Sequence, residues 1–139
     1  MKTFLFRLWQ WTWGFPQTLL GFVIFCLHRG APQRTYHGCI VTQWKNRGSL
    51  GVGMFLFLSQ RSFASEPQVQ VHEYGHSVQS AILGPLFLPV MGIPSFLWCN
   101  LPGPRRLRRE KGVSYYSFYT ESTANRLGSL AAREECTLS

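Results

Sequence analysis

Uncharged residues form two long runs in the chain, and the first of them occupies residues 8–27. Its twenty residues are enough for a helix to cross a hydrocarbon core about 30 Å thick. Tryptophans gather at its N-terminal end, as they do at membrane interfaces, and Gly14 and Pro16 interrupt it. Residues 1–30 are therefore predicted to be either a membrane anchor or an interfacial helix that ends near Trp13 and leads into a short membrane helix.

The second run, residues 77–104, carries no charge and is followed by the basic stretch RRLRREK. Three prolines and two glycines within residues 81–99 disfavour one straight helix. We expect a bent or re-entrant apolar segment there that turns near residues 92–94. Because arginines beside an apolar stretch stay in the cytoplasm, the face to which the segment returns is predicted to be cytoplasmic.

Shorter patterns between and after these runs predict the rest of the fold. Residues 36–44 and 53–59 are rich in β-branched and aromatic residues, and turn chemistry separates them, so we expect two strands paired as a hairpin. Ser65 as an N-cap and Pro67 in the first turn predict a helix that runs to about Leu83.

A last helix is predicted over residues 114–133, broken or weakened at Gly128. Together these patterns predict an α+β fold, with a small β-hairpin or sheet followed by two helices and with one or two apolar, membrane-associated helical segments. Residues 31–139, including the apolar segment 81–99, are expected to form one small domain.

The excess of basic over acidic residues indicates a negatively charged binding partner. Lysine and arginine number 14, against six acidic residues of which none is aspartate, and the formal charge is +8. Such a chain suits an anionic membrane surface or a nucleic acid. Aromatic residues make up 15%, many of them in uncharged runs, and no nucleic-acid-binding motif is visible. Membrane lipids are therefore the expected partner, and nucleic acid is not. The four cysteines form no C-x-x-C pair, which argues against a thiolate zinc site.

The stretch VHEYGHSVQS contains the pattern H-E-x-x-H on a predicted helix. Its spacing places His72 and His76 one turn apart on the same face, as imidazole ligands of zinc must be. Glu73 lies beside the pair, where it can deprotonate a metal-bound water. The alternative is a polar helix face, which would have to accept the helix-weakening Gly75. A glycine there also lets another backbone approach the helix closely.

A catalytic zinc requires a third protein ligand and an open fourth position. The acidic residues well downstream of the motif are Glu110, Glu121, Glu134 and Glu135. Glu110 is the expected counter-ion of the arginines around it, and the last two lie near the chain end. Glu121 is in the middle of the predicted last helix, and Asn125, one turn later, can orient a ligand histidine. Two histidines are alternative ligands: His28 and His37.

The motifs HEYGH and ESTAN together resemble the gluzincin group of zinc metallopeptidases, in which H-E-x-x-H is joined by E-x-x-A-D or E-x-x-S-D on a second helix. The resemblance implies a zinc ion held by His72, His76 and Glu121. It implies that Glu73 is the base in peptide-bond hydrolysis, and that the edge of a sheet preceding the motif helix binds substrate. The chain departs from the family at Asn125, which can orient a histidine but adds no negative charge.

The match spans about residues 35–130, and the wider pattern is similar to small membrane proteins of bacteria. Three tyrosines near Glu121 are candidates to stabilise the transition state, although packing is the ordinary role of such residues: Tyr115, Tyr116 and Tyr119. The expected function is a membrane-associated zinc metallopeptidase with a peptide or protein substrate and a site that faces the cytoplasm. One alternative is a non-enzymatic basic membrane protein with a structural or sensory metal site, and another is a basic membrane-surface protein without metal.

Overall fold

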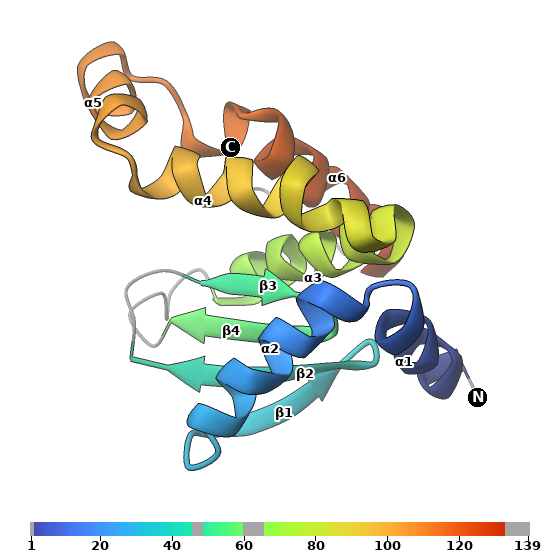
Figure 1. Ribbon diagram of the computed structural model, residues 1–139. Coiled ribbons are helices and arrows are strands. Elements are labelled where there is room, and N and C mark those ends of the chain that lie inside the picture. Colours follow the sequence, from blue (N-terminus) through green and yellow to red (C-terminus); the bar gives the residue numbers. More distant parts are fainter. Residues whose placement is uncertain (1, 46–48, 60–65, 133–139) are drawn as a thin grey trace.

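Four β-strands form one sheet with helices on both of its faces (Figure 1). The structure is a computed structural model, and it describes residues 2–45, 49–59 and 66–132. The helices before and directly after the strands are α1 (Lys2–Thr12), α2 (Phe15–Leu27) and α3 (Glu66–Leu83). The later helices are α4 (Ile93–Asn100), α5 (Pro102–Lys111) and α6 (Tyr119–Ala132). The α+β class predicted from the sequence is confirmed, and so is the helix predicted to end at Leu83.

The strands are β1 (Gln33–Tyr36), β2 (Cys39–Trp44), β3 (Leu50–Val52) and β4 (Phe55–Ser59), in the spatial order β1-β2-β4-β3. β2 and β4 are parallel, whereas the β1–β2 and β3–β4 pairs are antiparallel. The hairpin predicted between residues 36–44 and 53–59 is therefore wrong. The turn-rich stretch between them contains β3, which forms its own hairpin with β4 through Gly53, a residue with a φ of 61°. Residues 46–48 lie outside the described part of the chain.

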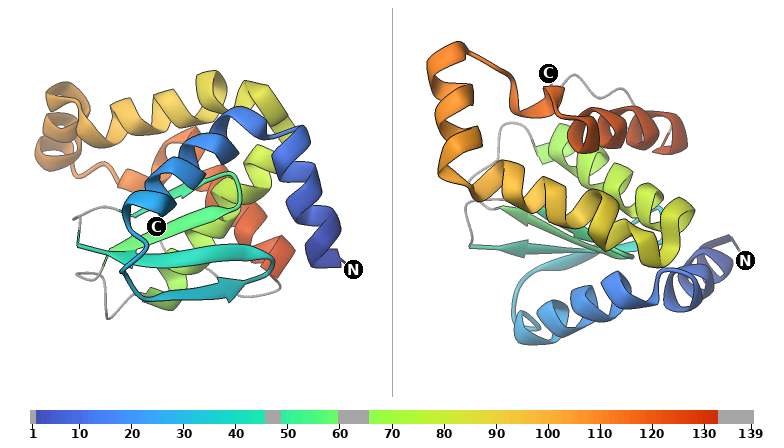
Figure 2. Two further views of the ribbon diagram at one scale, coloured as in Figure 1. Left: turned by 60° about the horizontal axis from the view of Figure 1, so that its bottom comes forward. Right: turned by 45° about the horizontal axis from the view of Figure 1, so that its top comes forward.

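β4 is buried along its whole length and contributes side chains to two cores. Phe55 and Phe57 pack on the side of α2, and Leu56 and Leu58 pack on the side of α3. This alternation is the two-residue period of a strand. It places α2 and the pair α3 and α6 on opposite faces of the sheet, as Figure 2 shows.

The first apolar run forms two helices, which meet at Trp13-Gly14, where the interfacial helix was predicted to end. A buried hydrogen bond links α1 to α3, since the side-chain amide of Gln10 donates to the carbonyl oxygen of Ser77 at 2.9 Å. Within residues 2–45, 49–59 and 66–132, no helix combines the length and the apolar composition that crossing a bilayer requires.

The turn predicted near residues 92–94 is wrong. The chain changes direction at Gly84, where φ is 58° and α3 has ended. It then passes through a π-helical stretch, Leu88–Gly92, directly into α4. The prolines of this segment do not break it, because each lies at the first or second position of a new helical segment. At those positions the missing N–H of proline costs little.

Candidate metal centre

α3 and α6 cross with almost no space between their backbones, because glycines lie at the crossing. A Cβ on Gly75 would be less than 3.0 Å from the backbone of Ala124, and one on Gly128 would also be less than 3.0 Å from the carbonyl oxygen of Val71. The close backbone approach expected at Gly75 is confirmed. The break considered at Gly128 is wrong, because this residue lies within a continuous α6, where it permits the contact with α3.

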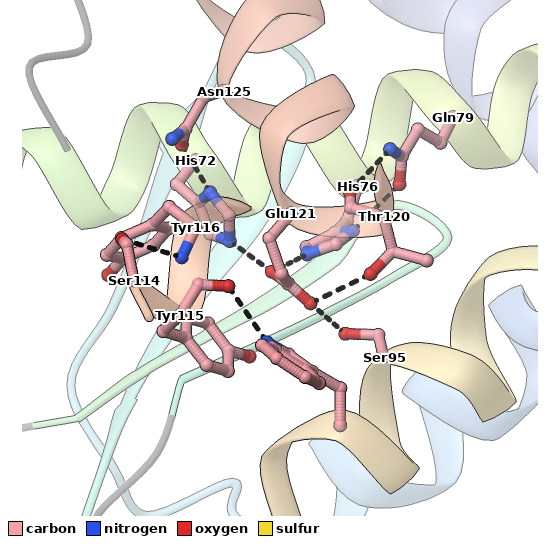
Figure 3. A network of polar contacts seen from close by, with 11 residues as sticks. His72, His76, Gln79, Ser95, Ser114, Tyr115, Tyr116, Thr120, Glu121 and Asn125 are labelled. Atoms are coloured by element: carbon pink, nitrogen blue, oxygen red, sulfur yellow. Dashed lines mark hydrogen bonds and ion pairs between the residues drawn. The ribbon is translucent and has the colours of Figure 1, made fainter. Parts of the chain in front are cut away.

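This crossing brings together the three side chains predicted as ligands, His72, His76 and Glu121 (Figure 3). Nε2 of His72 is 2.8 Å from Oε2 of Glu121, and Nε2 of His76 is 3.2 Å from the same oxygen. All three residues are buried, and their ligand atoms lie within 4.8 Å of one another. Two imidazoles and a carboxylate form a donor set that could hold a divalent metal ion.

The second ring nitrogen of each histidine is bound to an amide oxygen. Nδ1–H of His72 donates to Oδ1 of Asn125, and Nδ1–H of His76 donates to Oε1 of Gln79 at 2.8 Å. The amide nitrogen of Gln79 donates in turn to the carbonyl oxygen of Thr120. These bonds favour the tautomers in which each Nε2 can bind a metal. Gln79 was not predicted, although its place three residues after His76 puts it on the same helix face.

The other carboxylate oxygen of Glu121, Oε1, is held away from the histidines. It accepts a hydrogen bond from the hydroxyl of Ser95 and a longer one, 3.3 Å, from the hydroxyl of Thr120. Oε2 therefore stays directed at the two imidazoles. Ser95 lies on α4, in the apolar run, and no motif in the sequence pointed to it.

Burial and neighbouring charges shift the pKa values of this cluster. Burial alone would raise the pKa of Glu121, but the hydrogen bonds from His72 and His76 lower it well below its usual range. Burial would lower the pKa of His76, but the hydrogen bond and the charge of Glu121 outweigh it and raise the pKa to about 9. Glu73 differs, because burial raises the pKa of its carboxyl. The hydrogen bonds from the two histidines thus keep Glu121 ionised, as a metal ligand must be.

Glu73 lines an apolar pocket with a volume of about 380 Å³, together with His76 and Tyr115. The residue is 5% exposed, and its Oε2 has no hydrogen-bond partner among the described residues. β3 passes close to it, since a Cβ on Gly51 would lie 2.6 Å from the carbonyl oxygen of Glu73. A buried carboxylate oxygen without a partner is costly. Oε2 itself is enclosed by protein, with Gly51 of β3 beside it.

The three candidate tyrosines have different surroundings. Tyr115 lines the pocket beside Glu73, and burial raises the pKa of its hydroxyl. Tyr116 packs against the ring of His72, with the ring centroids 5.1 Å apart. Tyr119 is exposed, and its hydroxyl donates to a carbonyl oxygen of the π-helical stretch at 2.8 Å. Of the three, Tyr115 is the one that faces the pocket.

The alternative ligands lie elsewhere. Nδ1–H of His28 donates to a carbonyl oxygen of α2, at the end of that helix. His37 lies in the turn between β1 and β2 and stacks on Tyr74. Glu110 pairs with Arg106 at 2.9 Å on the exposed face of α5, as expected of a counter-ion. Two further acidic candidates are outside the described residues: Glu134 and Glu135.

Comparisons of the chain with protein-family models, with curated proteins and with solved structures found no match. The likeness to gluzincins is a resemblance of two motifs, and the fold brings these motifs into contact at the crossing of α3 and α6.

Proposed function

We propose that the protein is a zinc-dependent hydrolase that cleaves peptide bonds. The observation that carries the proposal is Glu73, a buried glutamate that lines a pocket next to a cluster that can hold a metal. A structural zinc site is normally closed by four protein ligands. The cluster formed by the described residues supplies three, which is the number expected of a catalytic site.

The donor set fits zinc. Ligand atoms in a tetrahedral zinc site with bonds of about 2.0–2.2 Å are roughly 3.3–3.6 Å apart. The separation of 3.2 Å between Nε2 of His76 and Oε2 of Glu121 is close to this range, and that of 2.8 Å from Nε2 of His72 is shorter. His72, His76 and Glu121 would hold the ion, which would polarise the scissile carbonyl and make a water molecule more acidic.

Glu73 would carry out the proton transfers. Its carboxylate accepts a proton from water while the water oxygen bonds to the carbonyl carbon of the substrate. Glu73 then gives that proton to the amide nitrogen as the carbon–nitrogen bond breaks. The hydroxyl of Tyr115, in the same pocket, would donate a hydrogen bond to the carbonyl oxygen as negative charge develops there.

The surroundings of the pocket favour an extended peptide with a large apolar side chain. β3 is one of the two edge strands of the sheet, and Leu50, Gly51 and Val52 line the pocket. An edge strand offers backbone groups to an extended peptide, which can add to the sheet as a further strand. Phe87 and Leu88 supply an apolar wall next to it.

Metal content and cleavage of a peptide mixture by the purified protein test this proposal. We expect the wild type to hold a single zinc, and His76→Ala and Glu121→Gln to lose it. His37→Ala and Glu110→Gln make the same kinds of change outside the site and should keep the metal. Glu73→Gln should also keep it, while cleavage falls on the order of 10²–10⁴-fold because the base is lost.

Each measurement can contradict a different part of the proposal. Equal, substoichiometric zinc in the wild type and both ligand variants would refute the metal site. Stoichiometric zinc without cleavage of any peptide would indicate a structural or sensory site in a non-enzymatic protein. Cleavage retained by Glu73→Gln would remove that residue from the mechanism.

A further inference from the structure

Large apolar side chains are exposed mainly on two segments of the chain. Among the described residues, all but two of the exposed large hydrophobic side chains belong to residues 4–27 or residues 82–107. The two exceptions are Tyr119 and Leu130, on α6. Single exposed apolar residues are ordinary, but a group of them marks an interaction site.

α2 and α4 flank the mouth of the pocket that contains Glu73. Leu20 of α2 and Ile93 and Phe96 of α4 line this pocket, and the same three residues are 45%, 54% and 64% exposed. Side chains that line a pocket and also face solvent form its rim. The opening that leads to Glu73 therefore lies within an apolar surface shared by α2 and α4, which we call the α2–α4 face.

A basic helix continues from this face. α5 begins after a single residue that follows α4, and it carries exposed Arg105, Arg109 and Lys111. Figure 1 shows α5 beyond the end of α4, away from the sheet. Arg108 anchors the helix there, since its guanidinium lies 4.8 Å from the ring centre of Trp98 on α4. Exposed apolar side chains and cations are thus neighbours on two consecutive helices.

We propose that the α2–α4 face and α5 dock on a lipid bilayer that contains anionic lipids. The apolar side chains leave water at the interface, and the cations of α5 are attracted to the negative headgroups. A second copy of the chain suits this surface less well, because it would bring another basic helix and a like net charge of +8. The composition of the chain predicted membrane lipids as a partner, and docking would assign that partner to a defined face of the molecule.

This orientation places the mouth of the pocket at the membrane surface. If the proposed function holds, the peptide that reaches Glu73 would be an apolar segment lying at that surface. The docking itself requires neither metal nor Glu73, so it can be tested separately.

Co-sedimentation of the purified full chain with vesicles tests the docking. Binding to phosphatidylcholine vesicles that contain phosphatidylglycerol should exceed binding to phosphatidylcholine alone and should fall as salt is added. Phe96→Ser should weaken binding about tenfold. The matched control is Leu130→Ser, because Leu130 is 67% exposed but lies on α6, and this change should leave binding unaltered.

Charge is tested by two double variants that lower the net charge equally. Arg105→Gln with Arg109→Gln should weaken binding on the order of tenfold, because cations near an anionic surface contribute directly to the attraction. Arg34→Gln with Arg126→Gln removes two exposed cations from β1 and α6 and should have a much smaller effect.

Equal binding to both kinds of vesicle would overturn the proposal, and so would equal losses in Phe96→Ser and Leu130→Ser. A stable dimer that Phe96→Ser dissociates and that binds no vesicles would also overturn it, since a second copy would then cover the face. Failure of docking is distinguishable from failure of the proposed function, because zinc content and cleavage can persist without vesicle binding. Conversely, Glu73→Gln and metal-stripped protein should bind vesicles as the wild type does.

Discussion

The two faces of the sheet are covered by helices in contrasting ways. On the face of α2, Phe55 packs against the rings of Trp11, Phe22 and Phe25, with centroids 5.4 to 6.4 Å apart. On the opposite face, α3 and α6 meet through glycines, and two histidines and two glutamates are buried close to that crossing. One face is filled by bulky rings, and the other depends on short backbone separations.

This difference follows from the metal ligands, which only the face of α3 and α6 has to hold in place. Ligands on two helices converge only if the helix backbones stay at a fixed separation, and Glu121 must reach both His72 and His76. Contacts through Gly75 and Gly128 involve backbone atoms, which cannot rotate away as side chains can. Aromatic rings stabilise the fold through buried area and can adjust in position. We therefore expect changes on the α3–α6 face to alter metal binding, and changes on the α2 face to alter mainly stability.

The largest effect on stability is expected from a substitution where α3 and α6 are closest. Gly75→Ala would place a Cβ against the backbone of Ala124, and overpacking of this kind should lower the free energy of unfolding by about 3 kcal/mol. Metal content should fall too, because the helices must separate. The matched control is Gly103→Ala on α5, where a Cβ meets no atom within 4 Å, and its effect should stay within about 0.5 kcal/mol. Urea unfolding measures both, and equal stabilities would show that the crossing is not tight.

A smaller effect, on zinc affinity, is expected when a residue that forms a hydrogen bond with a metal ligand is replaced. Asn125→Ala removes the acceptor that orients His72, so zinc affinity should fall roughly 10–100-fold while stability changes little. Asn125→Asp keeps the acceptor and adds a negative charge, so it should bind zinc at least as tightly as the wild type. Competition with a chelator measures both affinities, with Ser122→Ala, at an exposed position of the same helix, as the control. An unchanged affinity in Asn125→Ala would mean that this bond does not support the site.

The parts of the site that follow from local spacing were predictable from the sequence. A helical period alone places His72 and His76 on one face of α3, and it puts Asn125 one turn after Glu121. Gln79 lies on the same face of α3, but glutamine has no characteristic metal-site pattern. Ser95 reaches Glu121 because of the change of direction at Gly84, and such a contact between distant segments has no local signal.

The sheet was less predictable for a related reason. A strand that is buried on both sides, as β4 is, has an apolar sequence that fits parallel and antiparallel pairing equally well. β3 has three residues within a turn-rich stretch, too few for a periodic pattern. The prolines of residues 81–99 were interpreted as breaks, whereas each lies in the first turn of a helical segment, where proline is tolerated.

The smallest effect is expected on the face of α2, and it tests the comparison most directly. Phe55→Leu removes a ring that contacts three others but touches no ligand, so we expect a loss of about 1 kcal/mol in the free energy of unfolding and no change in zinc affinity. Leu56→Val, at the next residue of β4, alters the core under α3 by a similar energy of about 1 kcal/mol. Because α3 carries both histidines, this second change should lower zinc affinity measurably. The two variants therefore match in strand and in stability and differ in the face that they alter. Equal zinc affinities would mean that the separation between the sheet and α3 does not control the metal site.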